Sequence, residues 1–233
     1  MTLVRYDRHD HAIVQRFEAF VAGAEYPCVG AKAAMGNSAS FHFIARDIRS
    51  AWDDLGIHRS ICNFVTRVKG GADGLRSHVV LFEGPVELTE TAFETSLWER
   101  LSSISQKDKW MGYPHDDAIS DGPDHPNFGV SVGGTAFFVV GLHPGASRPA
   151  RRFERPALVF NLHSQFNTLK ADGRYSKMQT TIRSRDEKLA GSINPMLAAH
   201  GEISEARQYS GRGVGEDWRC PFSREVADDR KAA

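Results

Sequence analysis

The sequence predicts a single α+β domain in which helices flank a mainly antiparallel sheet. Short apolar runs bounded by glycine, proline or polar residues are typical of strands, and the chain contains several of them. Other segments repeat apolar residues every three or four positions, as amphipathic helices do. Two of the runs are joined by Gly133-Gly134, a typical hairpin turn. Helices mixed with hairpin-connected strands favour the α+β class.

The composition is that of an ordinary globular enzyme. The 233 residues are 41% hydrophobic and 25% charged, which fits one domain over residues 1–222 followed by a flexible charged tail over 223–233. The 29 basic residues balance 29 acidic ones, so the charge indicates neither a nucleic-acid nor a membrane partner. The longest apolar run, residues 136–142, is too short to span a bilayer.

Two features predict a cytoplasmic location. The first residues of the sequence lack the apolar core of a secretory signal. The three cysteines, Cys28, Cys62 and Cys220, are odd in number and widely spaced, which does not fit a disulfide framework. Free thiols suit a reducing compartment.

The first elements in chain order are a helix, a loop, a strand and a second helix. Residues 12–24 carry apolar side chains on one helical face, residues 25–38 are rich in small residues, and residues 40–45 read as a strand. A helix is then expected to begin with Asp47 as its N-cap. The side chains expected to face the core from this helix are those of Ile48, Trp52 and Leu55.

The middle of the chain predicts a strand, a helix and a long loop. Residues 77–82 are a strand-like apolar run that a Gly-Pro pair ends. Residues 91–104 repeat apolar side chains at helical spacing, and Thr91 and Glu94 have the spacing of a capping box. Residues 108–127 contain three prolines and are expected to form a loop, and loops of this length are often functional.

The last third predicts three strands and one helix. The strands are expected over residues 128–132, 136–142 and 157–162. A helix is expected over residues 175–189, with Met178, Ile182 and Leu189 on one side. Residues 191–222 show little periodicity and are dense in polar and aromatic side chains, which belong either on the surface or in a polar site.

An arginine-rich segment follows the apolar run 136–142. Its arginines are Arg148, Arg151, Arg152 and Arg155. Arginine binds carboxylates and phosphates through two parallel hydrogen bonds, so a haem propionate or an amino-acid carboxylate would suit these side chains. The alternative is a solvated loop with structural salt bridges.

Two histidines and two cysteines are candidate metal ligands. His143 and His163 each follow a predicted strand, and both could face one pocket. Cys28 and Cys220 each adjoin a proline, and a thiolate can ligate haem iron. The alternatives are hydrogen-bonded core histidines and small buried apolar cysteines.

Carboxylates near the two ends of the chain could recognise a cationic ligand. Glu25, Glu202 and Glu205 can accept hydrogen bonds from a guanidinium group. The alternative is that they belong to a surface lobe. The chain contains no dinucleotide fingerprint, P-loop, zinc-protease motif or serine-hydrolase elbow.

Seven motifs in order resemble the YqcI/YcgG family, whose members carry FPC and CPF motifs. They are Tyr26-Pro27-Cys28, with Tyr in place of the usual Phe, then GLHPGASRPARRF (141–153), VFNLHSQF (159–166), IRSRD (182–186), GSINPML (191–197), SEARQYSGR (204–212) and Cys220-Pro221-Phe222. The resemblance covers residues 25–222, nearly the whole chain.

The resemblance implies a haem-dependent enzyme. Characterised members of the family bind haem b and N-hydroxylate guanidino compounds, namely arginine or an arginine-derived cyclic guanidine. Such a reaction implies dioxygen or peroxide and an electron donor or reductase as partners, and a homodimer is possible. The alternatives are a haem-binding protein without oxygenase activity, or a non-haem metal or thiol enzyme that uses His143, His163 and either Cys28 or Cys220.

Roles follow from the resemblance together with the residue chemistry. His163 is the first candidate for the axial ligand of the haem iron, His143 is the second, and Cys28 or Cys220 is the third. The side chains expected to contact the haem propionates or a substrate carboxylate are Arg148, Arg151 and Arg152. Glu25 and Glu205 are expected to recognise the guanidinium.

Overall fold

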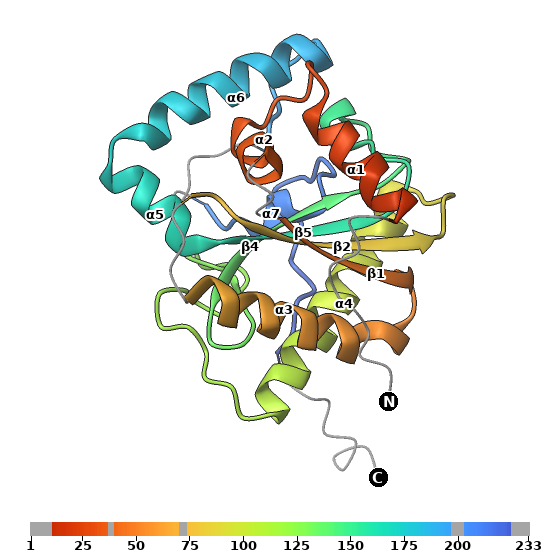
Figure 1. The fold of residues 1–233 in the computed structure, drawn as a ribbon, viewed down its shortest axis with the longest axis vertical. Helices are drawn as coiled ribbons and strands as arrows, with labels where there is room; N and C mark the ends of the chain where they lie inside the picture. The colour runs from red at the N-terminus through yellow and green to blue at the C-terminus, as the bar shows by residue number, and fades with distance from the viewer. Residues whose placement is uncertain (1–10, 37–39, 70–73, 197–202, 225–233) are drawn as a thin grey trace.

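A computed structural model describes residues 11–36, 40–69, 74–196 and 203–224 (Figure 1). Within these residues lies a five-stranded sheet in the order β1-β2-β5-β4-β3. Its strands are β1 (Ser40–Asp47), β2 (Ser77–Gly84), β3 (Val130–Ser131), β4 (Ala136–Leu142) and β5 (Ala157–Leu162). Only β1 and β2 run parallel, and the other three pairs are antiparallel. The predicted α+β class with a mainly antiparallel sheet is therefore confirmed.

Helices cover both faces of the sheet. They are α1 (Ala12–Ala22), α2 (Val29–Gly36), α3 (Asp54–Lys69), α4 (Glu90–Trp110), α5 (His163–Ala171), α6 (Arg174–Ala190) and α7 (Ala206–Tyr209), with short 3-10 turns at Ala51–Asp53 and Pro149–Arg151. Helices α1, α2, α5 and α6 lie on one face, which we call the α1/α6 face (Figure 1). Helices α3 and α4 lie on the other, the α3/α4 face. None of the described helices is both long enough and apolar enough to cross a membrane.

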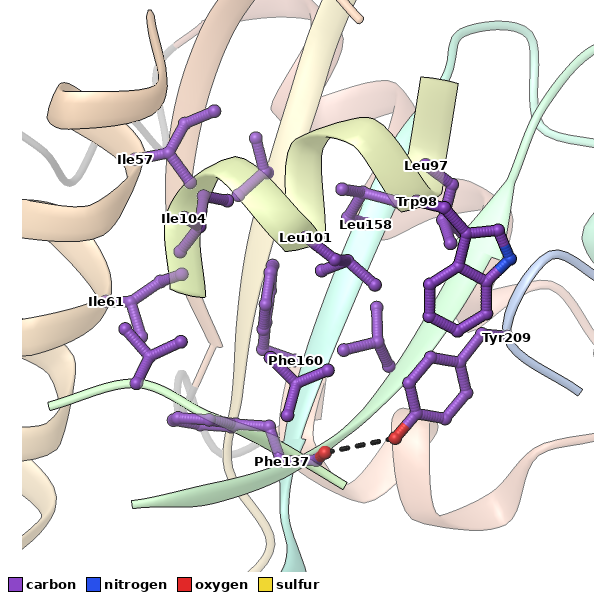
Figure 2. Close-up of a cluster of buried hydrophobic side chains, with 14 of the residues drawn as sticks. Ile57, Ile61, Leu97, Trp98, Leu101, Ile104, Phe137, Leu158, Phe160 and Tyr209 are labelled. Carbon is purple, nitrogen blue, oxygen red and sulfur yellow. Dashed lines mark hydrogen bonds between the residues drawn. The ribbon is translucent and has the colours of Figure 1, made fainter. Parts of the chain in front are cut away.

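The strands alternate their side chains between the two faces. On β2, Val80 and Phe82 pack toward α3 and α4, whereas Val79 and Leu81 pack toward α1. This alternation follows from the two-residue period of a strand. The α3/α4 side is the larger core, and Figure 2 shows residues of both helices meeting the sheet there. The Tyr209 hydroxyl donates a hydrogen bond to the carbonyl of Phe137 at 3.2 Å, which ties α7 to β4.

Most strand predictions hold to within two residues. The runs 136–142 and 157–162 are β4 and β5 without change, and β1 and β2 extend two residues beyond the predicted ends. The predicted run 128–132 pairs only at Val130–Ser131, which is β3. Gly133 and Gly134 have φ of +62° and +66°, so the hairpin turn between β3 and β4 is confirmed.

The predicted helix after Asp47 is wrong in its start and its buried face. The chain turns after β1 and α3 begins only at Asp54. Trp52 is 76% exposed and Leu55 is 38% exposed, while Ile48 is fully buried as predicted. The core face of α3 is instead formed by Ile57, Ile61, Phe64 and Val65.

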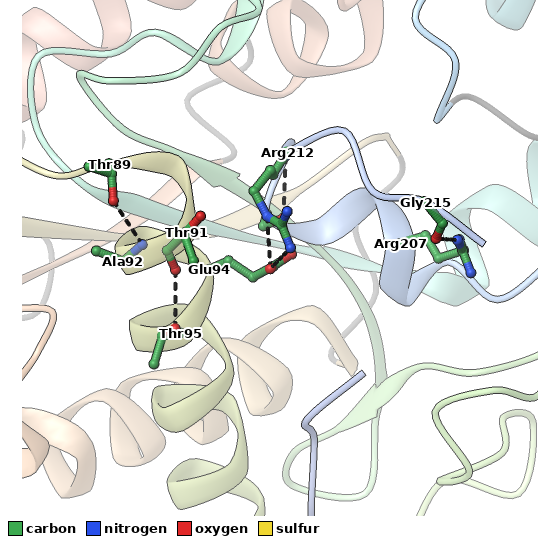
Figure 3. A network of polar contacts seen from close by, with 9 residues as sticks. Thr89, Thr91, Ala92, Glu94, Thr95, Arg207, Arg212 and Gly215 are labelled. Atoms are coloured by element: carbon green, nitrogen blue, oxygen red, sulfur yellow. Dashed lines mark hydrogen bonds and ion pairs between the residues drawn. The ribbon is translucent and has the colours of Figure 1, made fainter. Parts of the chain in front are cut away.

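The predicted capping box on α4 is also wrong. Helix α4 begins one residue earlier than expected, and its N-cap is Thr89, whose hydroxyl accepts a hydrogen bond from the amide of Ala92 (Figure 3). Glu94 points away from the cap. Its carboxylate accepts hydrogen bonds from Arg212 at 2.9 Å and from Ser210 at 3.0 Å. These contacts fasten the segment after α7 to the first turns of α4.

Three helices lie where no helix was predicted. Helix α2 occupies part of the expected loop over residues 25–38, α5 begins at His163 directly after β5, and the short α7 lies within the aperiodic segment 191–222. The expected loop over 108–127 is confirmed except at its start, because α4 continues to Trp110. The predicted tail beyond residue 224 and the candidate Glu202 lie outside the described residues.

Candidate functional site

A pocket lies on the α1/α6 face, between the sheet and helices α1, α2 and α6. Its volume is about 250 Å³, close to the lower end of the range for small-molecule sites. Its walls are mainly apolar, and they include Phe17, Val21, Met35, Phe138, Val140, Met178 and Ile182. Ser77 of β2 and Asn161 of β5 lie at the floor, where the Ser77 hydroxyl donates to the Asn161 side chain at 2.7 Å.

Six of the seven family-like motifs contribute side chains to this pocket. The contributing residues are Tyr26, Pro27 and Cys28; Arg148, Ala150 and Arg151; Val159, Asn161, Gln165 and Phe166; Ile182, Arg183 and Asp186; Asn194; and Glu205 and Gln208. Segments that lie up to about 180 residues apart in the chain thus meet in one place. The Cys220-Pro221-Phe222 motif does not line the pocket.

Cys28 lines the pocket immediately before α2. Its sulfur accepts a hydrogen bond from the amide of Ala31 at 3.4 Å. Burial raises the pKa of the Cys28 thiol, and the amides of Ala31 and Gly30 together with the Arg151 cation oppose that rise only in part. The thiol is therefore held neutral, and a bound cation would be needed to favour its thiolate.

The arginine-rich segment is used mostly to hold the protein together. Arg151 lines the pocket but donates to the carbonyls of Gly141, Gln208 and Tyr209 at 2.9, 3.1 and 3.3 Å. Arg152 lies outside the pocket and donates to two carbonyls of its own turn. The contacts of Arg151 and Arg152 are therefore those of structural side chains that bind the protein's own backbone.

Arg148 differs from these two because its partner is a carboxylate at the pocket. Its guanidinium pairs with Asp186 of α6, and both residues line the cavity. Arg148 also donates to Ser192 beyond the end of α6, at 3.1 Å to the hydroxyl and 3.0 Å to the carbonyl. Arg148 thus tethers α6 and the following turn to the body of the protein.

His163 and Glu205 lie together beside the pocket. His163 is 3% exposed, and its Nε2 lies 3.3 Å from Oε2 of Glu205. Glu205 lines the pocket, whereas His163 stands behind it. Burial lowers the pKa of His163 to about 4, and the Asp116 carboxylate offsets this only in part. The imidazole is therefore neutral near pH 7.

His143 does not share a site with His163. It stacks on Phe93 of α4 with ring centroids 4.2 Å apart, and it is 1% exposed. Burial lowers the pKa of His143 to about 4. Because β4 and β5 are antiparallel, the residues that follow the two strands lie at opposite ends of the sheet. The spacing of twenty residues therefore brings the two histidines to different places.

Two other sequence candidates also lie outside the pocket. Cys220 packs against the aromatic side of the α3/α4 core, and burial raises the pKa of its thiol to about 12. Its surroundings agree with the small apolar interpretation of this cysteine. Glu25 is exposed in the turn before Tyr26 and does not line the cavity.

Sequence reasoning missed Asp186 as a site residue. Met178, Ile182 and Asp186 follow one another at four-residue spacing on α6, and all three line the pocket. A carboxylate that continues an apolar helical stripe is the signal that could have identified it. Asp186 is 5% exposed, and it is the only fully buried residue of α6.

The comparisons agree with the convergence of these motifs. The model of the YqcI/YcgG family matches residues 17–223, which is most of the chain. No curated protein and no solved structure matches the chain significantly. Since the family match covers every segment that builds the pocket, the chain belongs to the YqcI/YcgG family.

Proposed function

We propose that the protein is a haem-dependent enzyme that N-hydroxylates the guanidino group of a small molecule, either arginine or an arginine-derived cyclic guanidine. The observation that carries this proposal is the meeting of six family motifs around one pocket that holds a thiol and two carboxylates. The family resemblance suggests the haem and the reaction, and the pocket chemistry is compatible with both.

The donor set of the pocket fits haem. The ring of haem is flat and apolar, and its two propionates are anionic. The apolar walls suit the ring, and Arg148 and Arg183 place cationic groups at the α6 side. Among the described histidines and cysteines, Cys28 is the one that lines the pocket, so we propose it as the ligand of the iron. His163 is the second choice, because Glu205 stands between it and the cavity.

The small size of the pocket implies that it would have to widen to admit haem. A volume of about 250 Å³ suits a ligand of amino-acid size better than a haem together with a substrate. Helix α6 buries only Asp186 fully, and Arg148 tethers it. An outward displacement of α6 would widen the pocket without exposing the core on the α3/α4 face.

The residues of the chain would bind and orient the substrate. The carboxylates of Glu205 and Asp186 can each accept hydrogen bonds from a guanidinium, and Asp186 already accepts one from Arg148. His163 would fix the orientation of Glu205, and the apolar walls would exclude water. Haem, when bound, would supply the activation of dioxygen or peroxide, with electrons from an external donor.

Titration of the purified protein with haemin tests the cofactor. We expect a saturable Soret band at one haem per chain, and the spectrum of the ferrous carbon monoxide complex to indicate thiolate ligation. Cys28→Ser should shift or abolish that band, whereas Cys220→Ser, which removes a thiol outside the pocket, should not. A protein that shows no specific Soret band would contradict the proposal. A band altered by His163→Ala and unchanged in Cys28→Ser would move the ligand to His163.

Addition of arginine or a cyclic guanidine to the haem-loaded protein tests the substrate class. A shift of the Soret band is expected in the wild type, and Glu205→Gln should weaken guanidine binding by at least about tenfold, because a carboxylate bound to guanidinium is a charge-assisted pair. Glu25→Gln alters the other predicted carboxylate and should leave the shift in place. Haem binding with no response to any guanidine would favour a haem-binding protein without oxygenase activity.

A further inference from the structure

A cluster of metal-ligating side chains lies far from the pocket, where α3 and α4 meet. His58 and Cys62 are four residues apart on α3 and therefore project from the same helical face. Asp108 faces them from the last turns of α4. Ligand atoms of the three side chains all lie within 4.8 Å of one another. Imidazole, thiolate and carboxylate together are a donor set that zinc accepts.

The carboxylate of Asp108 is only half satisfied. Its Oδ1 atom accepts hydrogen bonds from Nε2 of His58 and from the amide of Gly133, both at 2.8 Å. Its Oδ2 atom is buried and has no hydrogen-bond partner, and the residue is 0% exposed. A buried carboxylate oxygen without a donor costs about 1–3 kcal/mol. A cation bound at Oδ2 would remove that cost.

The distances suit a tetrahedral ion after a small adjustment. The sulfur of Cys62 lies 3.8 Å from Nε2 of His58, close to the roughly 3.5 Å that separates nitrogen and sulfur ligands of one zinc ion. The 2.8 Å between His58 and Asp108 Oδ1 is a hydrogen bond. An ion would therefore take Oδ2, the oxygen that has no other partner, while Oδ1 keeps the Gly133 amide.

The turn between β3 and β4 covers the cluster on one side, and Cys62 is partly accessible to solvent on another. The hairpin turn lies directly over the thiol, because a Cβ added at Gly133 would stand 3.2 Å from the sulfur. On the other side Cys62 is partly accessible, and the exposed Tyr113 has its ring centroid 5.6 Å from that of His58.

We propose that His58, Cys62 and Asp108 bind a divalent transition-metal ion of the zinc class, with a fourth position open to solvent beside Tyr113. Three protein ligands and one open position are the arrangement of catalytic rather than structural zinc. The site joins α3, the end of α4 and the turn between β3 and β4. It uses none of the residues that line the pocket on the α1/α6 face.

Cobalt(II) titration of the haem-free, chelator-treated protein tests the proposal. One equivalent should produce thiolate-to-cobalt charge-transfer absorption together with the visible bands of tetrahedral cobalt. Zinc should displace the cobalt and raise the unfolding temperature, since an ion that binds only the folded state stabilises it. Cys62→Ser should abolish the charge-transfer band and weaken binding by at least about tenfold, by comparison with the losses known for outer-shell partners.

Matched variants keep the experiment decisive. Cys220→Ser removes a thiol elsewhere in the fold and should leave the cobalt spectrum unchanged. Asp108→Asn should weaken binding while circular dichroism shows that the fold is kept, and Cys62→Ser tests the site again if that variant unfolds. Absence of saturable binding would overturn the proposal. So would a spectrum that survives Cys62→Ser and disappears in Cys28→Ser, which would place the ion in the pocket. Because no haem is present, failure of haem binding leaves this test unaffected.

Discussion

Among the described residues, the two longest helices differ in how many of their side chains they bury. Helix α4 buries ten of its 21 residues, and they include Trp98 and Leu101 of the core (Figure 2). Helix α6 buries only Asp186 among 17 residues. Most helical stability in proteins comes from packing an apolar face. Helix α6 is therefore held by partly buried side chains at the pocket and by the Arg148–Asp186 pair, which suits a helix that covers a binding site better than part of a core.

Truncation of one apolar residue on each helix tests this difference most directly. Leu101→Ala on α4 should lower the free energy of unfolding by about 3 kcal/mol, because the side chain is completely buried. Met178→Ala on α6 should cost less than about 1 kcal/mol, because Met178 is only partly buried at the pocket. Denaturant unfolding with unchanged m-values measures both. Equal losses would show that α6 is as much a part of the core as α4.

Acid should destabilise the packing on the α3/α4 face, because histidines are buried there without a charge. Burial lowers the pKa of His78 to about 3 and of His143 to about 4, so both are neutral in the folded protein and gain protons on unfolding. The contribution of these two histidines is therefore fully present above about pH 6.5 and is lost toward about pH 4, by up to about 1.4 kcal/mol per pH unit for each histidine.

Unfolding curves between pH 4 and 7 measure this loss. His143→Asn should reduce the pH slope, because one titrating group is removed from contact with Phe93. His125→Asn changes an exposed histidine and serves as the control for the substitution itself. A slope that is the same in wild type and in His143→Asn would mean that folding does not lower the pKa of His143.

Weakening of the Arg148–Asp186 pair is the change most informative about α6. Asp186→Asn keeps a hydrogen-bond acceptor for Arg148 but removes the charge, so the cost should be about 1 kcal/mol. Hydrogen exchange of the α6 amides should become faster while that of α4 stays the same. Asp172→Asn disturbs an exposed pair with Arg174 and serves as the control. Unchanged hydrogen exchange in α6 would show that the Arg148–Asp186 pair does not hold this helix in place.

The sequence was informative about strands and less so about helix ends. Periodicity and turn residues located β4, β5 and the Gly133-Gly134 turn because those signals are local. The parallel pairing of β1 with β2 depends on the path of α3 between them, which no local signal specifies. Trp52 was assigned to the core because its spacing fits a helix that in fact begins only later, at Asp54.

Only part of the candidate site was predictable, because local motifs identify residues and do not show which of them the fold brings together. The motifs pointed to Cys28, Arg148 and Glu205, which the fold brings to one pocket. Residue type alone could not separate His163, which lies beside that pocket, from His143, because strand direction decides where each residue lies. The cluster of His58, Cys62 and Asp108 was missed because Asp108 was expected in a loop, although a histidine and a cysteine four residues apart on a helix were a usable signal.

The strand order has a consequence for how the chain folds. β1, α3 and β2 are consecutive, and so are β3, β4 and β5, so each group can form from contacts between near neighbours in sequence. The pairing of β2 with β5 joins the two groups across a separation of about 80 residues, and its loop-closure entropy makes it a late step. The hydrogen bond between Ser77 of β2 and Asn161 of β5 joins the two groups at the pocket floor. A ligand seated there would bridge contacts that form after the folding transition state, so it would slow unfolding more than it would accelerate folding.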